Sequence, residues 1–273
     1  MATKFYKGAK PLLSQPSLGG GLLGRAYIGG QLVYGAAPAG LPAVVQNFDI
    51  FYSADQTTTW TDQSGNGNNG TVSVAGSGGT SAVTHVGGAT PYWDFTAPNP
   101  SSEQSYVETN VAPGALSNNT PFSIFVVFQD PDLSVNNALL TSFDASADQL
   151  SMGTSRTTNK IFVNLRGGGV NKQILSTVTI SENTWYMAII TYGGNPGTDI
   201  YQLTLNNEPR GGDNPTSLDL SQTLQVGRNI TSSTTVNRQR IAAWGWAAGY
   251  ELSGTDRQDL FDYYGASYTF PSV

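Results

Sequence analysis

The sequence predicts an all-β fold: a two-sheet antiparallel sandwich with one short C-terminal helix and a small N-terminal β segment. Short apolar runs separated by turn residues recur from Val44 onward, without helical patterns between them, as in sandwiches and barrels. Charged residues make up 12% of the chain, about half of the usual share. Aromatic residues make up 11%, so the 273 residues can build a large hydrophobic core.

Residues 1–36 differ from the rest of the chain. Phe5 and Tyr6 form a short aromatic run, and two apolar runs flank Gly29-Gly30, a pattern typical of a small hairpin. Isolated hairpins are marginal in water, so this segment either pads the main domain or anchors the chain to another protein. We favour an anchor made by Phe5, Tyr6, Tyr27, Ile28, Leu32, Val33 and Tyr34. Residues 37–45 are then a linker, and residues 46–273 form the sandwich.

The predicted strands of the sandwich differ in how they are buried. Residues 122–128 are apolar on both faces, which favours the centre of a sheet. Residues 160–166 alternate, with Ile161, Val163 and Leu165 facing inward. Further strands are predicted at 185–192, 199–206, 224–228 and 240–246, with a turn at Asn206-Asn207.

One helix is predicted near the C-terminal end. Ser253 and Asp256 form a variant of the capping box, with an apolar residue ahead of the cap. Leu260, Phe261 and Tyr264 then form one apolar stripe, and Gly265 is the expected stop. We expect this helix to dock on an edge of the sandwich.

Several segments of the chain follow one another in the order found in a known domain family. Residues 60–71, WTDQSGNGNNGT, resemble the turn that opens many concanavalin A-like lectin/glucanase domains of the LamG-like type. The later matches are the WDF segment at 93–95, the strand at 122–128, the Trp-Tyr pair at 185–186, the strand at 224–228, and the ELS and YYG segments at 251–253 and 263–265. The resemblance covers residues 46–270 and implies a jelly-roll sandwich.

The opening turn has two interpretations. In the structural one, Gly65, Gly67 and Gly70 permit positive φ, the intervening asparagines bond to backbone, and Asp62 accepts from loop N–H groups. In the other, suggested by relatives that bind calcium, Asp62 and Asp94 are Ca²⁺ ligands. Carboxylates are sparse here, whereas Ca²⁺ takes six to eight oxygens, so we favour the structural interpretation. We expect no other cofactor.

A second resemblance concerns residues 27–35. They are similar to segments that precede lectin-like domains in tailed-phage virion proteins, namely fibres, tail-associated proteins and head decorations. This implies a structural protein on the surface of the capsid or tail, bound to other virion proteins through residues 1–36 and displaying its lectin-like domain for decoration or for host-surface glycan adhesion. We expect a homo-oligomer, with a trimer favoured. Gly8, Pro11 and Gln15 interrupt the N-terminal region, so we expect no secretion signal.

Several classes of function are disfavoured. The formal net charge is −6 with scattered cations, which argues against nucleic-acid binding, and no apolar stretch is long enough for a membrane helix. We find no catalytic residue: the E-x-D-x-E carboxylates of the glucanase relatives are absent. Asp130 and Asp132 flank a proline and are interpreted as loop residues. His85, the only histidine, is interpreted as a satisfied loop residue, and cysteine is absent.

Candidate glycan contacts remain. Trp244 and Trp246 share one strand face; core packing is favoured, and the alternative is a sugar-stacking platform. Arg166 and Asn171, with Arg156, Asn159 and Lys172, flank a Gly-rich hairpin that we interpret as a polar binding edge. A free carbohydrate-binding protein is the alternative to the virion protein, and a glycan hydrolase is a remote one.

Overall fold

The computed structural model describes residues 17–18, 21–22, 25–28 and 31–35 as backbone strands, and residues 40–75, 83–95, 104–116, 119–143, 149–167, 170–195, 199–213, 218–220, 222–228 and 238–273. The predicted anchor residues Phe5 and Tyr6 lie outside these ranges. No helix within the described ranges is long and apolar enough to cross a membrane.

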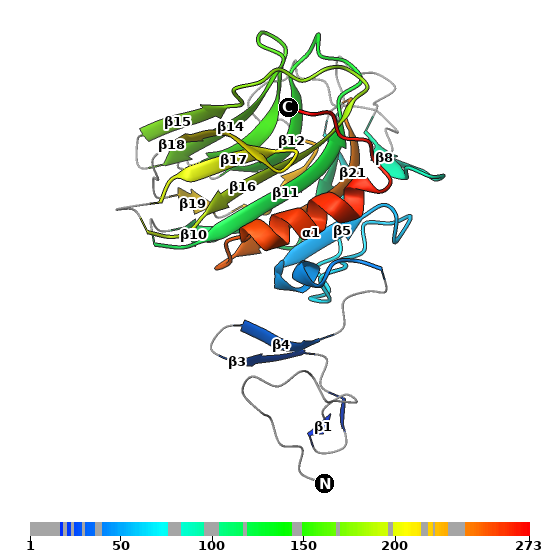
Figure 1. Cartoon of the computed structure of the whole chain (residues 1–273), viewed down its shortest axis with the longest axis vertical. Helices are drawn as coiled ribbons and strands as arrows, with labels where there is room; N and C mark the ends of the chain where they lie inside the picture. The colour runs from blue at the N-terminus through cyan, green and yellow to red at the C-terminus, as the bar shows by residue number, and fades with distance from the viewer. Residues whose placement is uncertain are drawn as a thin grey trace.

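Two antiparallel sheets form the sandwich, which confirms the predicted fold class (Figure 1). The eight-stranded sheet has the order β18 (Glu208–Asp213), β17 (Tyr201–Leu205), β16 (Trp185–Tyr192), β11 (Phe122–Gln129), β21 (Arg240–Ala248), β8 (Tyr92–Asp94), β7 (Thr84–Val86), with β5 (Ile50–Ser53) also pairing with β21. The seven-stranded sheet has the order β15 (Val170–Leu175), β14 (Lys160–Gly167), β13 (Gln149–Ser155), β12 (Asn137–Phe143), β20 (Gln225–Val226), β9 (Gln104–Glu108), β6 (Thr71–Ala75). A small ribbon joins β10 (Gly114–Leu116) to β19 (Leu218–Leu220).

The main core fills the space between the two sheets. It receives every second side chain of β14, because Ile161, Val163 and Leu165 are fully buried there. This confirms the inward face predicted from the alternation. The turn predicted at Asn206-Asn207 is also confirmed, since both residues adopt positive φ, at 46° and 65°.

A second core lies on the outer face of the eight-stranded sheet. There the 3-10 helix η1 (Ala43–Asn47) and the helix α1 (Gly254–Gly265) cover the sheet, and Figure 1 shows α1 lying across it. Phe125 and Val127 of β11 face this second core, while Ile124 and Val126 face the first. Both faces of β11 are therefore buried, as predicted, but the helix docks on the face of a sheet rather than on the sandwich edge.

The start of α1 is as predicted and its end is not. Ser253 accepts from the Asp256 backbone N–H, and the Asp256 carboxylate accepts from the Ser253 N–H, so the capping box is present. Gly265 is the last helical residue, and the C-cap is Ala266 in right-handed geometry. The helix is held at this end by Tyr264, whose hydroxyl lies 2.6 Å from the Ser53 Oγ on β5.

The N-terminal segment contains two small hairpins. β1 (Ser17–Leu18) pairs with β2 (Gly21–Leu22), and β3 (Arg25–Ile28) pairs with β4 (Gln31–Gly35) across the predicted Gly-Gly connection. Figure 1 shows β3 and β4 outside the sandwich.

The predicted linker, residues 37–45, overlaps the sandwich. Val44 and Val45 belong to η1 and are buried in the second core. The sandwich therefore begins inside the predicted linker, because these apolar side chains cover the outer face of the eight-stranded sheet.

Candidate functional site

Asp62 pins the opening turn to β5. Its Oδ1 accepts from the backbone N–H of Phe51 at 3.0 Å and of Ser64 at 2.9 Å, and its Oδ2 accepts from the N–H of Asn68 at 3.0 Å. The carboxylate is buried, and both of its oxygens accept hydrogen bonds from N–H donors. A bound cation would instead need oxygens that are free to coordinate it. This geometry favours the structural interpretation of the turn.

The glycines of the turn have two roles. Gly65 and Gly67 adopt positive φ, at 84° and 79°, as predicted. Gly70 does not have the predicted positive φ; a Cβ there would lie 2.5 Å from Val107 Cγ1, so this position needs glycine for a close approach. Asp94, the second candidate calcium ligand, lies 3.5 Å from the Arg240 Nε, and the described ranges contain no group of three or more acidic or histidine side chains arranged to hold a metal.

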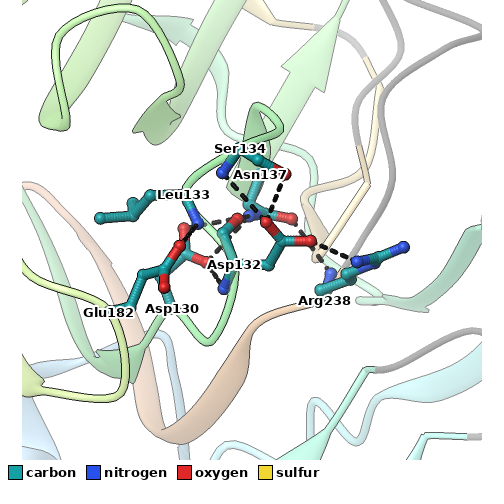
Figure 2. Close-up of polar contacts among 7 residues, drawn as sticks. All are labelled: Asp130, Asp132, Leu133, Ser134, Asn137, Glu182 and Arg238. Carbon is teal, nitrogen blue, oxygen red and sulfur yellow. Dashed lines mark hydrogen bonds and ion pairs between the residues drawn. The ribbon is translucent and has the colours of Figure 1, made fainter.

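The acidic loop after β11 uses its carboxylates internally (Figure 2). Asp130 is buried and accepts from Asn137 Nδ2 at 3.0 Å on each oxygen, and from the Thr154 hydroxyl. Glu182 Oε1 accepts from the Leu133 N–H at 2.9 Å. Burial raises the pKa of Asp130. These contacts give the carboxylates a role in fixing the loop.

Asp132 ties the same loop to the segment that leads into β21. It accepts from the N–H of Ser134 at 3.0 Å and forms an ion pair with Arg238 (Figure 2). Hydrogen bonding from the Ser134 hydroxyl is the main reason why the pKa of Asp132 lies below its usual value. A glycosidase needs two carboxylates that face the scissile bond, whereas Asp132 is committed to Ser134 and Arg238.

The two candidate platform tryptophans are core residues. Trp244 and Trp246 are both 0% exposed, and they stack on Tyr52 and Phe122 with ring centroids 5.9 and 5.5 Å apart. The alternative of a sugar-stacking platform at these two residues is therefore wrong, because the facing sheet covers the side of β21 from which they project. The structure supports the favoured interpretation, core packing.

The other predicted binding residues are divided between two ends of a hairpin. Arg166 and Asn171 are exposed cross-strand partners on β14 and β15. Arg156 and Asn159 lie in the turn at the opposite end of β14. Lys172 pairs with Leu165, whose side chain faces the core. The single polar edge predicted from the sequence is thus two polar ends with a surface between them.

That surface, which we call the β13–β15 platform, is the outward face of three neighbouring strands. The residues that alternate with those facing the core form four cross-strand rows: Gln149, Arg166 and Asn171; Ser151, Asn164 and Gln173; Gly153, Phe162 and Leu175; and Ser155 with Lys160. The β13 members Gln149, Ser151 and Gly153 are buried, whereas Arg166, Asn171, Gln173 and Leu175 are exposed. Both helices of the described part of the chain lie on the other sheet. The platform is therefore not covered by either of them.

Phe162 is the aromatic residue of the platform. Its ring lies over Gly153, since a Cβ added to Gly153 would lie 2.9 Å from the ring atom Cζ. On its other side Phe162 pairs with Leu175, which is 38% exposed. Sequence reasoning missed Phe162, although the alternation that buries its two neighbours in the chain already placed it on the outward face.

Gly153, Phe162 and Leu175 form an apolar strip across the platform, and polar rows border it. Gln173 Nε2 donates to Asn164 Oδ1 at 2.9 Å, and Gln149 Nε2 donates to the Ser151 Oγ at 3.0 Å. The row through Ser151 continues across the whole sheet by successive pairings with Thr141, Gln225, Glu108 and Thr71. An apolar strip beside amides and hydroxyls matches a ligand that has both C–H faces and hydroxyl groups.

The fold is a jelly-roll sandwich with one face covered by helices and a polar platform on the other. No family model matches the sequence, and no curated protein matches it. Among solved structures, the chain is similar to the receptor-binding domain of botulinum neurotoxin type G, with 14% identity over 79% of this chain and 51% of that one, at a TM-score of 0.56. It is similar to botulinum neurotoxin type C, described as interacting with two ganglioside molecules, with 16% identity over 83% of this chain and 53% of that one, at a TM-score of 0.58.

A third similar structure is shorter. It is domain 4 of a GH43 extracellular arabinanase from Geobacillus stearothermophilus in complex with arabinotriose, with 13% identity over 78% of this chain and 98% of that one, at a TM-score of 0.57. The chain spans about half the length of the neurotoxin domains. At these identities the similarity establishes the jelly-roll fold.

Proposed function

We propose that the sandwich is a non-enzymatic, lectin-like domain that binds a glycan on the β13–β15 platform. The observation that carries this proposal is the apolar strip at Phe162, bordered by rows of amide and hydroxyl side chains. An aromatic ring suits the C–H face of a sugar, and the adjoining polar groups can exchange hydrogen bonds with its hydroxyls. The similarity of the fold to a neurotoxin receptor-binding domain and to an arabinanase domain in complex with arabinotriose supports a binding role.

A glycan array followed by titration tests this proposal. Phe162→Ala should weaken binding about threefold to tenfold, since an aromatic contact is worth roughly 0.5–1.5 kcal/mol beyond its buried area. Phe270→Ala is the matched control, because Phe270 is also half-buried but packs on Phe261 of α1, which covers the other sheet. If wild type and Phe162→Ala are both folded and bind the glycan equally tightly, the platform is not the binding surface.

The absence of catalysis is part of the same proposal. The carboxylates of Asp130, Asp132 and Glu182 hold one loop together instead of facing a ligand. Incubation of the purified chain with the glycan that it binds should release no reducing ends. Release that disappears in Asp130→Asn would instead assign hydrolysis to this loop.

We further propose that residues 1–36 mount this domain on a phage capsid or tail as a homo-oligomer, with a trimer favoured. The position of β3 and β4 outside the sandwich supports a docking role for Tyr27, Ile28, Leu32, Val33 and Tyr34 (Figure 1).

Deletion of residues 1–36 tests the mounting proposal. The truncated chain should keep a folded, glycan-binding sandwich and be lost from purified particles. A full-length chain that binds glycan but is never associated with particles would instead favour the alternative, a free carbohydrate-binding protein.

A further inference from the structure

The sheet that carries the platform has an uneven distribution of charge. Residues 149–181 include Arg156, Lys160, Arg166 and Lys172 and contain no Asp or Glu, in a chain with 13 Lys and Arg against 19 Asp and Glu. These residues comprise β13, β14, β15 and the segment that follows them. The platform therefore lies in a cationic part of an acidic protein.

The cations stand at both ends of the platform. Lys160 and Arg166 lie on the outward face of β14, six residues apart, which corresponds to roughly 20 Å along a strand. Arg156 is exposed in the turn next to Lys160. The ion pairs Asp132–Arg238 and Asp94–Arg240 do not involve these three cations.

The acidic residues lie off the outward face of the three platform strands. Glu108 of β9 is in the same cross-strand row as Ser151 but three strands away, roughly 15 Å, and Asp148 precedes β13 in the chain. Asp256, Asp259 and Asp262 lie on α1, on the far side of the other sheet. Charges in solution are screened over about 8 Å at physiological ionic strength, which is less than the roughly 10 Å between two packed sheets. Lys160 and Arg166 are therefore the charged side chains on the outward face of β13, β14 and β15, in a chain with a net charge of −6.

From this arrangement we infer that the ligand is a polyanionic polysaccharide that lies along β14, with acidic groups at Lys160 and Arg166 and a sugar ring over Phe162. The inference rests on the proposed glycan binding and names the chemical class of the glycan. A single sugar cannot reach both ends of a platform roughly 20 Å long, but a polymer with repeated acidic groups can. The guanidinium of Arg166 suits the paired oxygens of a carboxylate or a sulfate.

A polysaccharide fits this surface better than single-stranded nucleic acid does. Non-specific nucleic-acid grooves carry several aromatic side chains on which successive bases stack. The platform rows contain one aromatic residue, Phe162, and are otherwise mainly amides and hydroxyls.

The test measures binding of the intact chain to polygalacturonate, dextran sulfate, neutral dextran and single-stranded DNA. We expect one of the two acidic polysaccharides to bind at least about tenfold more tightly than neutral dextran, and to weaken as salt is raised. The double variant Lys160→Gln/Arg166→Gln should lose about tenfold in affinity, as expected for two exposed ion pairs. Arg257→Gln removes the same type of charge from α1 and should leave binding unchanged. The two acidic probes distinguish carboxylated from sulfated ligands.

Three results would overturn the inference. If binding to neutral dextran depends on Phe162 but not on Lys160 and Arg166, the proposed glycan binding stands and the inference of an acidic ligand is wrong. If the chain binds single-stranded DNA as tightly as it binds the polysaccharides, the platform is a non-specific cationic surface. Binding to none of the polysaccharides, by a chain that is folded, would overturn both this inference and the proposed function.

Discussion

At the scale of single residues, Asp62 is the clearest case of a side chain that accepts backbone hydrogen bonds in place of a main-chain carbonyl. Three backbone N–H groups, at Phe51, Ser64 and Asn68, depend on one buried carboxylate. Asp62→Ala should lower the free energy of unfolding by about 3 kcal/mol, because it removes charge-assisted hydrogen bonds and leaves buried donors unpaired.

Urea denaturation measures the effect of Asp62→Ala, with Asp259→Ala on the exposed face of α1 as the control, expected to stay within about 0.5 kcal/mol. A chelator should leave the wild-type melting temperature unchanged. A loss of stability on chelation would favour the calcium interpretation instead.

Asp132 gives the protein a pH-dependent contribution to stability. Its folded-state pKa is lowered, chiefly by the Ser134 hydroxyl, from the unfolded value of about 3.9. The contribution is therefore present above that unfolded value and is lost as the pH falls through the folded pKa. Asp132→Asn should lower the free energy of unfolding at neutral pH, and its difference from wild type should shrink in acid.

Unfolding curves from pH 7 down to about pH 2 check this prediction, with Asp259→Asn as the control. A difference between wild type and Asp132→Asn that stays constant over the whole range would contradict it. The raised pKa of Asp130 acts in the opposite direction, because its buried charge costs stability as the pH rises through its folded pKa.

At the scale of elements, α1 covers the second core on the outer face of the eight-stranded sheet. Leu260 and Tyr264 are buried against the eight-stranded sheet, and Ser253 caps the helix. Leu260→Ala should cost about 3 kcal/mol through lost burial and the cavity left behind. Ser253→Ala should cost about 1 kcal/mol through the lost cap. Thr255→Ala, at an exposed position of the same helix, serves as the control.

Thermal and urea unfolding measure these helix variants. A cost for Leu260→Ala no larger than that for Thr255→Ala would mean that the helix is not docked as described.

The strands show how far the sequence predicts the fold. Alternation identified the inward residues of β14, and the doubly apolar run identified β11 as a central strand. Alternation does not tell which layer covers each face, because that depends on how distant elements pack. For this reason the sequence does not place the helix on the face of the sheet, and it does not distinguish a buried from an exposed position for Trp244 and Trp246, which the facing sheet covers.

The candidate site can be predicted only in part, because its local features are visible in the sequence and its packing between distant strands is not. The hairpin between β14 and β15 brings Arg166 opposite Asn171, which a Gly-rich turn between two strands already indicates. The register of β13 against β14 is set by the whole sheet, and it places Gly153 beneath Phe162. A sequence pattern alone does not contain that juxtaposition.

At the scale of the whole molecule, the two outer faces of the sandwich differ. Helices close the face of the eight-stranded sheet, whereas the seven-stranded sheet presents the β13–β15 platform with cations at its ends. The small hairpin of β3 and β4 lies outside both sheets (Figure 1). Under the proposed function, the seven-stranded sheet binds the ligand, and the eight-stranded sheet is closed by helices.

The most direct test of this assignment is a backbone-amide NMR titration of the intact chain with an oligosaccharide of the acidic glycan that it binds. We predict that the largest shift changes cluster in β13, β14 and β15, centred on Phe162, and that Phe162→Ala moves their midpoint to about threefold to tenfold higher ligand concentration. Shift changes confined to the groove lined by Phe261 and Phe270 beside α1 would contradict it, because the ligand would then occupy the opposite face of the sandwich.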